Sequence, residues 1–282
     1  MLTERHAGRW GLLVALLCLQ GVVWGQNTIP FVTEWTFTQP KTLPLKFSGA
    51  NNVTIDWGDG SPLQTFTGNT VTHAYPAGTH QVAVFCSADT PEDFGGFKLD
   101  WNFRVFLVDV LSFGTGEWST FSQAFRGARN CAFSATDAPV FGPTCTNMVQ
   151  AFEDCDGLLD YDFTGWDVSG ITQMNSLFAG ANFTGDVSNW DVSQVVNMGS
   201  MFNSAAAFNG DLSAWDVSSV ENMFAMFYRA YAFNGDLSSW ETTSLTNMQQ
   251  MFDQATNFNQ PIGGFDVSNV TNMSYAFRQA YQ

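Results

Sequence analysis

Basic residues are scarce in this chain of 282 residues. Ten Lys and Arg stand against 26 Asp and Glu, which gives a formal net charge of −16. Such an excess of negative charge repels phosphate backbones and anionic lipid surfaces, so nucleic acid and membrane-surface partners are not expected. Only 13% of the residues are charged, whereas 45% are hydrophobic. This composition predicts a folded acidic protein and excludes a disordered one.

Histidine and cysteine are also few. The chain has three His and five Cys, and no C-x-x-C or H-x-x-x-H spacing occurs. Because such spacings are typical of zinc and redox sites, a metal centre is not expected. The shortage of His and Cys also argues against most classes of enzyme. By contrast, 27 Phe and 10 Trp provide ample material for a core.

Residues 1–25 are expected to be a secretory signal peptide. Arg5 and Arg9 lie in a basic start, residues 10–19 are apolar, and a small residue, Gly25, precedes the expected cleavage point. The alternative is an uncleaved membrane anchor, but the apolar run is too short to span ~30 Å of hydrocarbon. We therefore expect a secreted or cell-surface protein with no membrane span after signal removal.

An internal repeat of about 25 residues occupies the C-terminal half of the chain. Its large aromatic residues recur at steps of 24 or 25 and are Trp166, Trp190, Trp215, Trp240 and Phe265. With Leu212 as position 1 of a unit, apolar residues fall at positions 1, 4, 6, 9, 12, 15, 16, 19 and 22. Weaker units precede them around Phe121 and Met148. No unit can bury these side chains alone, so we expect the units to stack into one continuous core.

The spacing inside a unit predicts a strand followed by a helix. Positions 4 and 6, for example Trp215 and Val217, alternate as in a half-buried strand. Positions 12, 15, 16 and 19 have the spacing of a helix face. We therefore expect strand–turn–helix units stacked into an α/β solenoid.

The repeated motif carries a resemblance to a known family. Trp-Asp-Val-Ser-x-Val-x-Asn-Met-x-x-Met-Phe-x-x-Ala is similar to the repeat of the BspA-like leucine-rich-repeat (LRR) surface proteins, over residues 121–282 and most closely from Phe163 onward. Departures include Glu241-Thr242-Thr243 in place of Asp-Val-Ser and Phe265 in place of Trp. The resemblance implies a secreted or surface-attached, LRR-like solenoid that acts in adhesion or recognition. It supplies no catalytic residues.

The segment before the repeats has a different pattern. Residues 53–61 form an alternating strand that runs into an Asp-Gly turn, and residues 71–84 form two strands around a Pro/Gly turn. The Trp57-Gly58-Asp59-Gly60 turn and the His73-x-Tyr75 strand resemble a PKD-like β-sandwich domain. That resemblance implies an all-β spacer or partner-binding module.

Four segments are therefore expected. They are a signal peptide (1–25), a PKD-like β-sandwich domain (26–88), connecting strands that start the stack (89–120) and the BspA-like LRR solenoid (121–282). No polar capping segment precedes Gln282, so we expect the stack to be incomplete there or to associate with itself through its last coil.

Four cysteines remain after signal removal: Cys86, Cys131, Cys145 and Cys155. In an oxidising compartment they allow three pairings. Cys131 and Cys155 occupy inward positions of adjacent units, so they are the pair that we expect to form a disulfide.

The candidate binding face is a column of acidic residues at position 5. Its members are Asp167, Asp191, Asp216, Glu241 and Asp266. They point outward because positions 4 and 6 point inward, and stacking would bring them ~4.8 Å apart. Uncompensated repulsion at that distance would raise their pKa. A second column, just before position 1, contains Asp162, Asp186, Asp211 and Asp236.

Two interpretations of these columns stay open. The acids either hydrogen-bond nearby backbone and Ser/Thr groups, or they form an anionic face that binds Ca²⁺ or a basic partner. In the N-terminal segment, Asp56 and Asp59 are too few to hold Ca²⁺, and hydrogen bonding within their turn explains both. His73 and His80 have no Ser or Cys partner at a recognisable spacing and are expected to be ordinary strand residues.

These observations predict a secreted or cell-surface, non-enzymatic repeat protein that recognises an extracellular protein or glycan. No cofactor is expected, with Ca²⁺ on the acidic face as the alternative. The nearest alternative function is a structural wall or matrix component that self-associates. A secreted glycan-acting enzyme is more remote, because the candidate acids recur in several units whereas a catalytic pair is unique.

Overall fold

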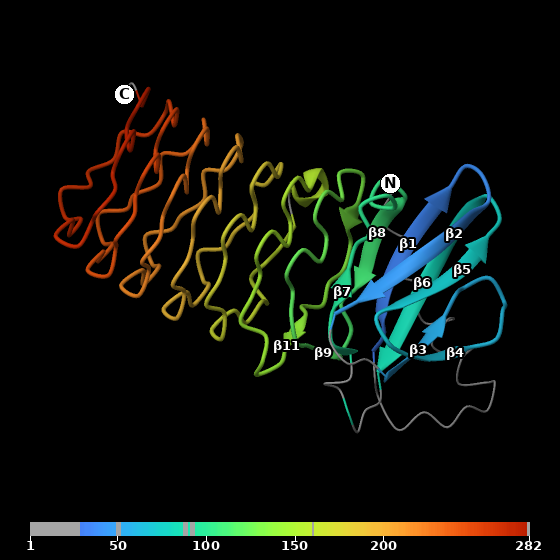
Figure 1. Cartoon of the computed structure of the whole chain (residues 1–282). Helices are drawn as coiled ribbons and strands as arrows, with labels where there is room; N and C mark the ends of the chain where they lie inside the picture. Colours follow the sequence, from blue (N-terminus) through green and yellow to red (C-terminus); the bar gives the residue numbers. More distant parts are fainter. Residues whose placement is uncertain (1–28, 49–51, 87–89, 91–93, 160, 281–282) are drawn as a thin grey trace.

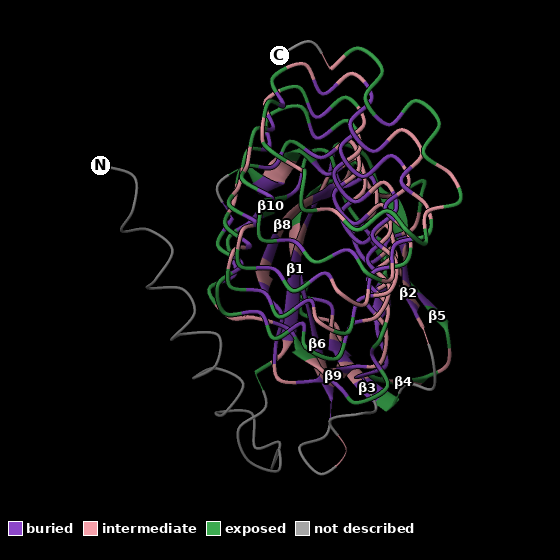
Figure 2. Cartoon of the chain, turned by 90° about the vertical axis from the view of Figure 1, so that its left-hand side faces the viewer, coloured by how far each residue is buried: buried purple, intermediate pink, exposed green. Residues whose placement is uncertain are grey.

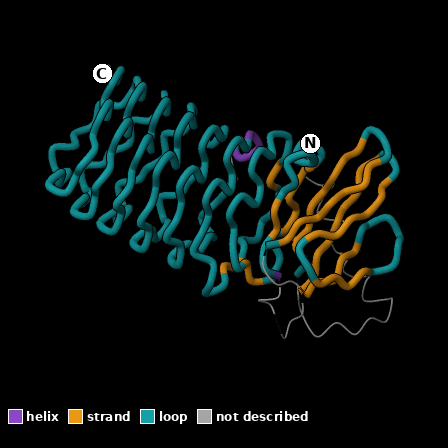
Figure 3. Tube along the Cα trace, viewed as in Figure 1, coloured by secondary structure: helices purple, strands orange, loops and turns teal. Residues whose placement is uncertain are grey.

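The computed structural model describes residues 29–48, 52–86, 90, 94–159 and 161–280. The expected signal peptide lies outside them. Figure 1 shows β-sheets in the N-terminal part and a row of coils that leads from them to the C-terminus. The described residues contain no α-helix, and η2 (Asp156–Leu158) is a short 3₁₀ turn (Figure 3). None of them forms a helix long and apolar enough to cross a bilayer.

The N-terminal part consists of two sheets. Their strands are β1 (Phe31–Phe37), β2 (Lys41–Phe47), β3 (Asn52–Asp56), β4 (Gln64–Thr67), β5 (Thr70–Tyr75), β6 (Gly78–Cys86), β7 (Phe97–Lys98), β8 (Leu107–Ser112) and β10 (Ala132–Phe133). One sheet has the order β10-β8-β1-β6-β3-β4 and the other β5-β2-β7. This confirms the expected all-β N-terminal region. The larger sheet also includes β8 and β10, so it continues past residue 88, where we expected the first domain to end.

Alternating side chains from both sheets fill a shared core. In β2, Leu43, Leu45 and Phe47 are buried, as a strand with one inward face requires. Phe37 of β1 stacks on Tyr75 of β5 with ring centroids 5.6 Å apart. The two sheets are therefore held face to face by apolar contact.

Two carboxylates connect the larger sheet to the coils. Asp137 accepts hydrogen bonds from Ser112 Oγ and Gly114 N, both at 2.8 Å. Asp109 accepts them from Ser134 Oγ at 2.8 Å and Ser134 N at 3.0 Å. Burial raises the pKa of Asp109 although the bonds from Ser134 oppose that rise. Two further short strands, β9 (Glu117–Trp118) and β11 (Val140–Phe141), pair in parallel where the stack begins.

Each sequence repeat forms one coil, and successive coils are joined by backbone hydrogen bonds. Single parallel bridges connect position 11 of each coil to the next, through Asn147, Gln173, Asn197, Asn222, Asn247 and Asn272. Beyond that position every second N–H donates to a carbonyl of the following coil. Met223 N donates to Asn247 O at 2.9 Å, and Ala225 N donates to Gln249 O at 2.8 Å. Each coil is thus joined to its neighbour along a ladder of backbone bonds.

The expected helix at positions 12–19 is wrong, because these residues form consecutive tight turns. Met226 N donates to Met223 O at 3.2 Å and Ala230 N to Phe227 O at 3.1 Å. The residues at positions 14 and 18 have a left-handed backbone in each coil. In one coil φ is 50° at Ala225 (position 14) and 56° at Arg229 (position 18). An α-helix cannot contain such residues. The turns nevertheless direct positions 12, 15, 16 and 19 inward, so they have the apolar spacing of a helix.

The expected strand at positions 4–6 is also not formed as regular strand, although its side-chain alternation is confirmed. Trp215 and Val217 are buried and Asp216 between them is exposed. In Figure 2 the exposed residues lie along the outer bends of the coils.

Aromatic rings stack from coil to coil inside. Phe202 lies 5.7 Å from Phe227, and Phe227 lies 5.5 Å from Phe252, with nearly parallel rings. The Trp215 indole N–H donates to Val187 O of the preceding coil at 3.0 Å. Rings and indoles therefore lock each coil to the next.

Trp215→Ala should lower the free energy of unfolding by about 3–5 kcal/mol, because it opens a cavity between coils and removes the indole hydrogen bond. Ser213→Ala, at a half-buried residue two positions away, should change it by less than about 1 kcal/mol, because it removes only one hydroxyl. Urea unfolding of both variants measures this. Equal losses would mean that the buried and exposed faces are interchanged.

Ser200→Gly provides a test of the turn geometry. Ser200 has a φ of 58°, a conformation that favours glycine, so the substitution should stabilise the protein by roughly 0.5–1 kcal/mol. In a helix the same change would destabilise it by a similar amount. Ser193→Gly, at a residue outside the left-handed set, is the control and should destabilise. Thermal melts that show Ser200→Gly and Ser193→Gly to be equally harmful would contradict the turns.

Candidate functional site

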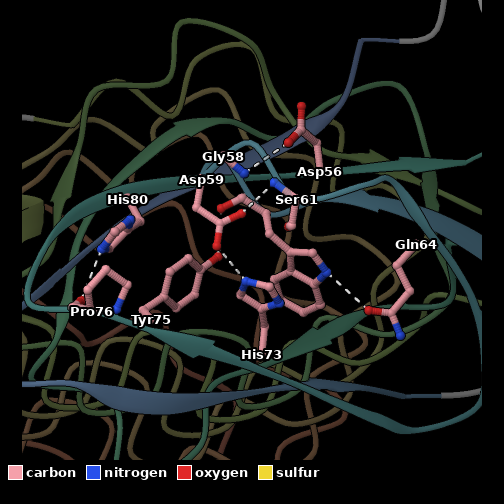
Figure 4. Close-up of polar contacts among 10 residues, drawn as sticks. Asp56, Gly58, Asp59, Ser61, Gln64, His73, Tyr75, Pro76 and His80 are labelled. Carbon is pink, nitrogen blue, oxygen red and sulfur yellow. Dashed lines mark hydrogen bonds and ion pairs between the residues drawn. The ribbon is translucent and has the colours of Figure 1, made fainter.

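The Trp57-Gly58-Asp59-Gly60 turn is closed by its own carboxylates (Figure 4). Asp56 Oδ1 accepts from Gly58 N at 2.9 Å and Asp59 Oδ1 accepts from Ser61 N at 3.0 Å. Gly58 has a φ of 70°, and a Cβ there would lie 2.0 Å from Gln81 O, so only glycine fits. Hydrogen bonding within the turn, as expected, therefore accounts for Asp56 and for one oxygen of Asp59.

His73 of β5 packs against this turn and pairs with it. Its Nε2 lies 2.7 Å from Asp59 Oδ2, and its ring stacks on Trp57 at 4.6 Å. Tyr75 donates from its hydroxyl to Trp57 O at 2.7 Å. Partial burial raises the pKa of Asp59, but hydrogen bonds from Ser61 and His73 outweigh it and hold that pKa well below its usual range. This pair could not be predicted from the sequence, because the two residues are brought together only when β5 packs beside the turn.

The contacts of this cluster hold the turn against β5. A hydrolytic triad requires a nucleophile on the ring nitrogen of His that faces away from the carboxylate. Within the described part of the chain, His73 makes its side-chain hydrogen bond to Asp59, and none to a Ser or Cys is seen. His80 lies nearby and contacts Pro76 O through its Nε2 at 3.2 Å. The histidines therefore fasten a turn and a strand end, as expected of ordinary strand residues.

Asp59→Asn should lower stability at neutral pH by about 1–3 kcal/mol, because the amide keeps the cap on Ser61 N but loses the charge that pairs with His73. The lowered pKa of Asp59 fixes the sign of the pH dependence. Its contribution is complete above the unfolded value near pH 4 and is lost as pH falls below it. The difference in stability between wild type and variant should thus shrink in acid. A difference that is constant from pH 7 to pH 2 would contradict the assignment.

The outer acidic column has a local explanation. Its aspartates accept hydrogen bonds from the backbone N–H two residues later, at 3.1 Å for Asp167, 3.1 Å for Asp191, 3.0 Å for Asp216 and 2.9 Å for Asp266. The second column repeats the arrangement, at 2.9 Å for Asp162, 2.8 Å for Asp186, 2.9 Å for Asp211 and 2.9 Å for Asp236. Both columns thus cap turns.

Capping reverses the expected electrostatics. Hydrogen bonds from the side chain and backbone of the serine two residues later lower the pKa of Asp167, Asp216 and Asp266. The first of the two interpretations, local hydrogen bonding, is therefore confirmed. The rise in pKa that uncompensated repulsion would cause does not occur at these three residues, since the local bonds favour the ionised form. The backbone N–H groups all donate to Oδ1. The carboxylates are ionised, oriented and open on one side.

No group of three or more His, Cys, Asp or Glu side chains suited to a metal ion occurs in the part of the chain that is described. Ca²⁺ needs six to eight oxygen ligands, whereas each coil offers one open carboxylate oxygen in this column. A few millimolar Ca²⁺ should therefore change the melting temperature by less than a few degrees relative to chelator. A larger rise, abolished in Asp191→Asn/Asp216→Asn, would establish a cation site instead.

The disulfide expected between Cys131 and Cys155 is not present. Both residues are fully buried thiols, as Cys86 and Cys145 are buried thiols. Cys131 Sγ faces Ala132 O at 3.1 Å and Cys155 Sγ faces Ala128 O at 3.5 Å, so the two sulfur atoms are directed to different carbonyls. Burial raises the pKa of both thiols.

Comparison with known proteins finds a family match for one part of the chain. The family model described as Mycoplasma protein of unknown function, DUF285, matches residues 146–256 and 226–282. Residues 146–282 therefore form a DUF285 domain, and they coincide with the regular coils. No curated protein and no solved structure matches the chain.

Proposed function

We propose that this chain is a secreted or cell-surface, non-enzymatic protein whose stacked repeats bind an extracellular protein or glycan. The observation that carries the proposal is the outer acidic column, Asp167, Asp191, Asp216, Glu241 and Asp266. Its residues are exposed, and none belongs to the ion pairs of the described residues. Caps on four of the five fix the direction of the charge before any partner arrives.

Preorganised, evenly spaced charges suit recognition. Because the caps already restrict the side chains, little conformational entropy is lost when a partner binds. The column also steers a basic partner toward the coils. Between two of its acids, Asp216 and Glu241, lies a shallow hollow of about 380 Å³ that also includes Ser213 and Trp215. This hollow has the polar lining that a basic or hydroxyl-bearing group requires.

The proposal also includes a family assignment for each of the two parts of the chain. We infer that residues 121–282 are a solenoid related to the BspA-like LRR surface proteins and that the N-terminal sheets are a PKD-like domain. The repeated Trp-Asp-Val-Ser motif supports the first inference, and the Trp57-Gly58-Asp59-Gly60 turn supports the second. The basic and apolar start of the chain supports secretion.

Binding of the chain from residue 26 to immobilised basic extracellular proteins and glycans tests the proposal. Asp191→Asn/Asp216→Asn/Asp266→Asn keeps the Oδ1 caps and removes three charges, and it should weaken binding at least about tenfold. Binding to wild type should also fall as salt rises. The control, Asp186→Asn/Asp211→Asn/Asp236→Asn, removes equal charge from the second column and should bind as wild type does. Equal losses in the two triple variants would refute a specific face.

A further inference from the structure

The regular pattern of the stack fails at one coil. In the unit that contains Met148, position 1 is Asp137 where later units have Phe163, Val187 or Leu212. Position 4 is Val140 in place of Trp, and it is 43% exposed. Places where a repeated pattern breaks are candidates for function, because regular packing has been given up there.

A hollow of about 360 Å³ lies at this break. Its lining includes Phe133, Asp137, Tyr161, Asp162, Thr164 and Trp166. The volume lies within the range of about 300–1,000 Å³ that is typical of small-ligand sites. It is separate from the outer acidic column, whose first member points outward one residue after Trp166.

An indole N–H in this lining lacks the acceptor that its repeats possess. Trp190, Trp215 and Trp240 donate to the position-1 carbonyl of the preceding coil, at 3.3, 3.0 and 2.9 Å. Trp166 occupies the same position and is only 5% exposed, yet its Nε1 has no hydrogen-bond partner in the part of the chain that is described. The neighbouring polar group is the Tyr161 hydroxyl: burial raises the pKa of that tyrosine to about 12, and its interaction with the Trp166 side chain opposes the rise. That interaction is too long or too bent to count as a hydrogen bond, so the Trp166 N–H remains unsatisfied. A buried N–H left without an acceptor is rare in folded proteins.

The lining defines the chemistry of a ligand. Trp166 donates, Asp162 and Asp137 accept, and Tyr161 and Thr164 carry hydroxyls that do either. Asp137 Oδ1 accepts only Phe113 N at 3.1 Å, and Asp162 accepts Thr164 N through Oδ1 at 2.9 Å, so both carboxylates keep acceptor capacity. Ligand hydroxyls satisfy such a mixture because each donates and accepts, whereas the two aspartates repel anions.

We propose that this hollow is a binding site for a neutral saccharide unit. Its hydroxyls take the Trp166 N–H and donate to Asp162, and its C–H faces lie against the Phe133 and Tyr161 rings. The site goes beyond the recognition function proposed above, because it uses a different surface and a different class of ligand.

Titration of the chain from residue 26 with cellobiose, lactose, maltose and diacetylchitobiose, followed by isothermal calorimetry and by indole NMR shifts, tests the site. At least one of these sugars should bind with a Kd of about 10 mM or tighter. Trp166→Phe keeps a ring but removes the N–H, and it should weaken that binding at least about tenfold. Thr164→Val, on the exposed rim, should weaken it as well.

The matched control is Trp190→Phe, which removes an indole N–H that is already bonded to Phe163 O. It should lower the melting temperature and leave sugar affinity within about twofold, the reverse of the effect expected for Trp166→Phe. The triple Asn variant of the outer acidic column should bind the sugar as wild type does, which separates this site from the proposed function. Absence of binding to all four sugars, tighter binding of choline than of any sugar, or equal affinity in wild type and Trp166→Phe would overturn the proposal.

Discussion

Hydrogen bonding between coils is the constraint on which the rest of the stack depends. Along positions 12–18 every second N–H donates to the next coil, for example Phe227 N to Met251 O at 2.8 Å. The intervening groups close tight turns within their own coil, so the buried backbone is satisfied. This alternation requires left-handed residues at positions 14 and 18. Each carries a penalty on the order of 1 kcal/mol for residues other than glycine, which the surrounding packing must offset.

The same ladder places the side chains. Because the coils stay in register, Phe202, Phe227 and Phe252 meet ring to ring, and Asn222 Nδ2 reaches Asn197 Oδ1 at 3.0 Å. The N–H groups left free at the start of the ladder are capped by asparagines, as when Asn222 Oδ1 accepts from Phe224 N at 3.0 Å. Aspartates cap the other turns of each coil, as Asp216 does for Ser218 N. The outer acidic column is thus first a consequence of how the backbone is satisfied. Recognition, as proposed here, uses charges that the fold already needs.

Sequence periodicity identified the repeat, its inward positions and the outward acids, because apolar spacing reports burial directly. It did not identify the backbone conformation of positions 12–19, since two consecutive turns and a helix bury the same positions. Gly127 and Gly180, both at position 18 and both with positive φ, were the available signal. The lowered pKa of Asp216 was also readable, because a serine follows it two residues later. The pairing of Asp59 with His73 was not, because it depends on how a turn packs against a strand distant in sequence.

Joining a sheet to a stack of coils explains why the irregular coil lies where it does. Asp137 occupies position 1 of its unit, but its carboxylate accepts from Ser112 and Gly114 at the end of β8. An apolar residue there would continue the core but would remove the acceptor that links this coil to Ser112 and Gly114. In the same region, no described residue accepts the Trp166 N–H. A buried donor that the fold leaves unsatisfied is a donor that a ligand can satisfy.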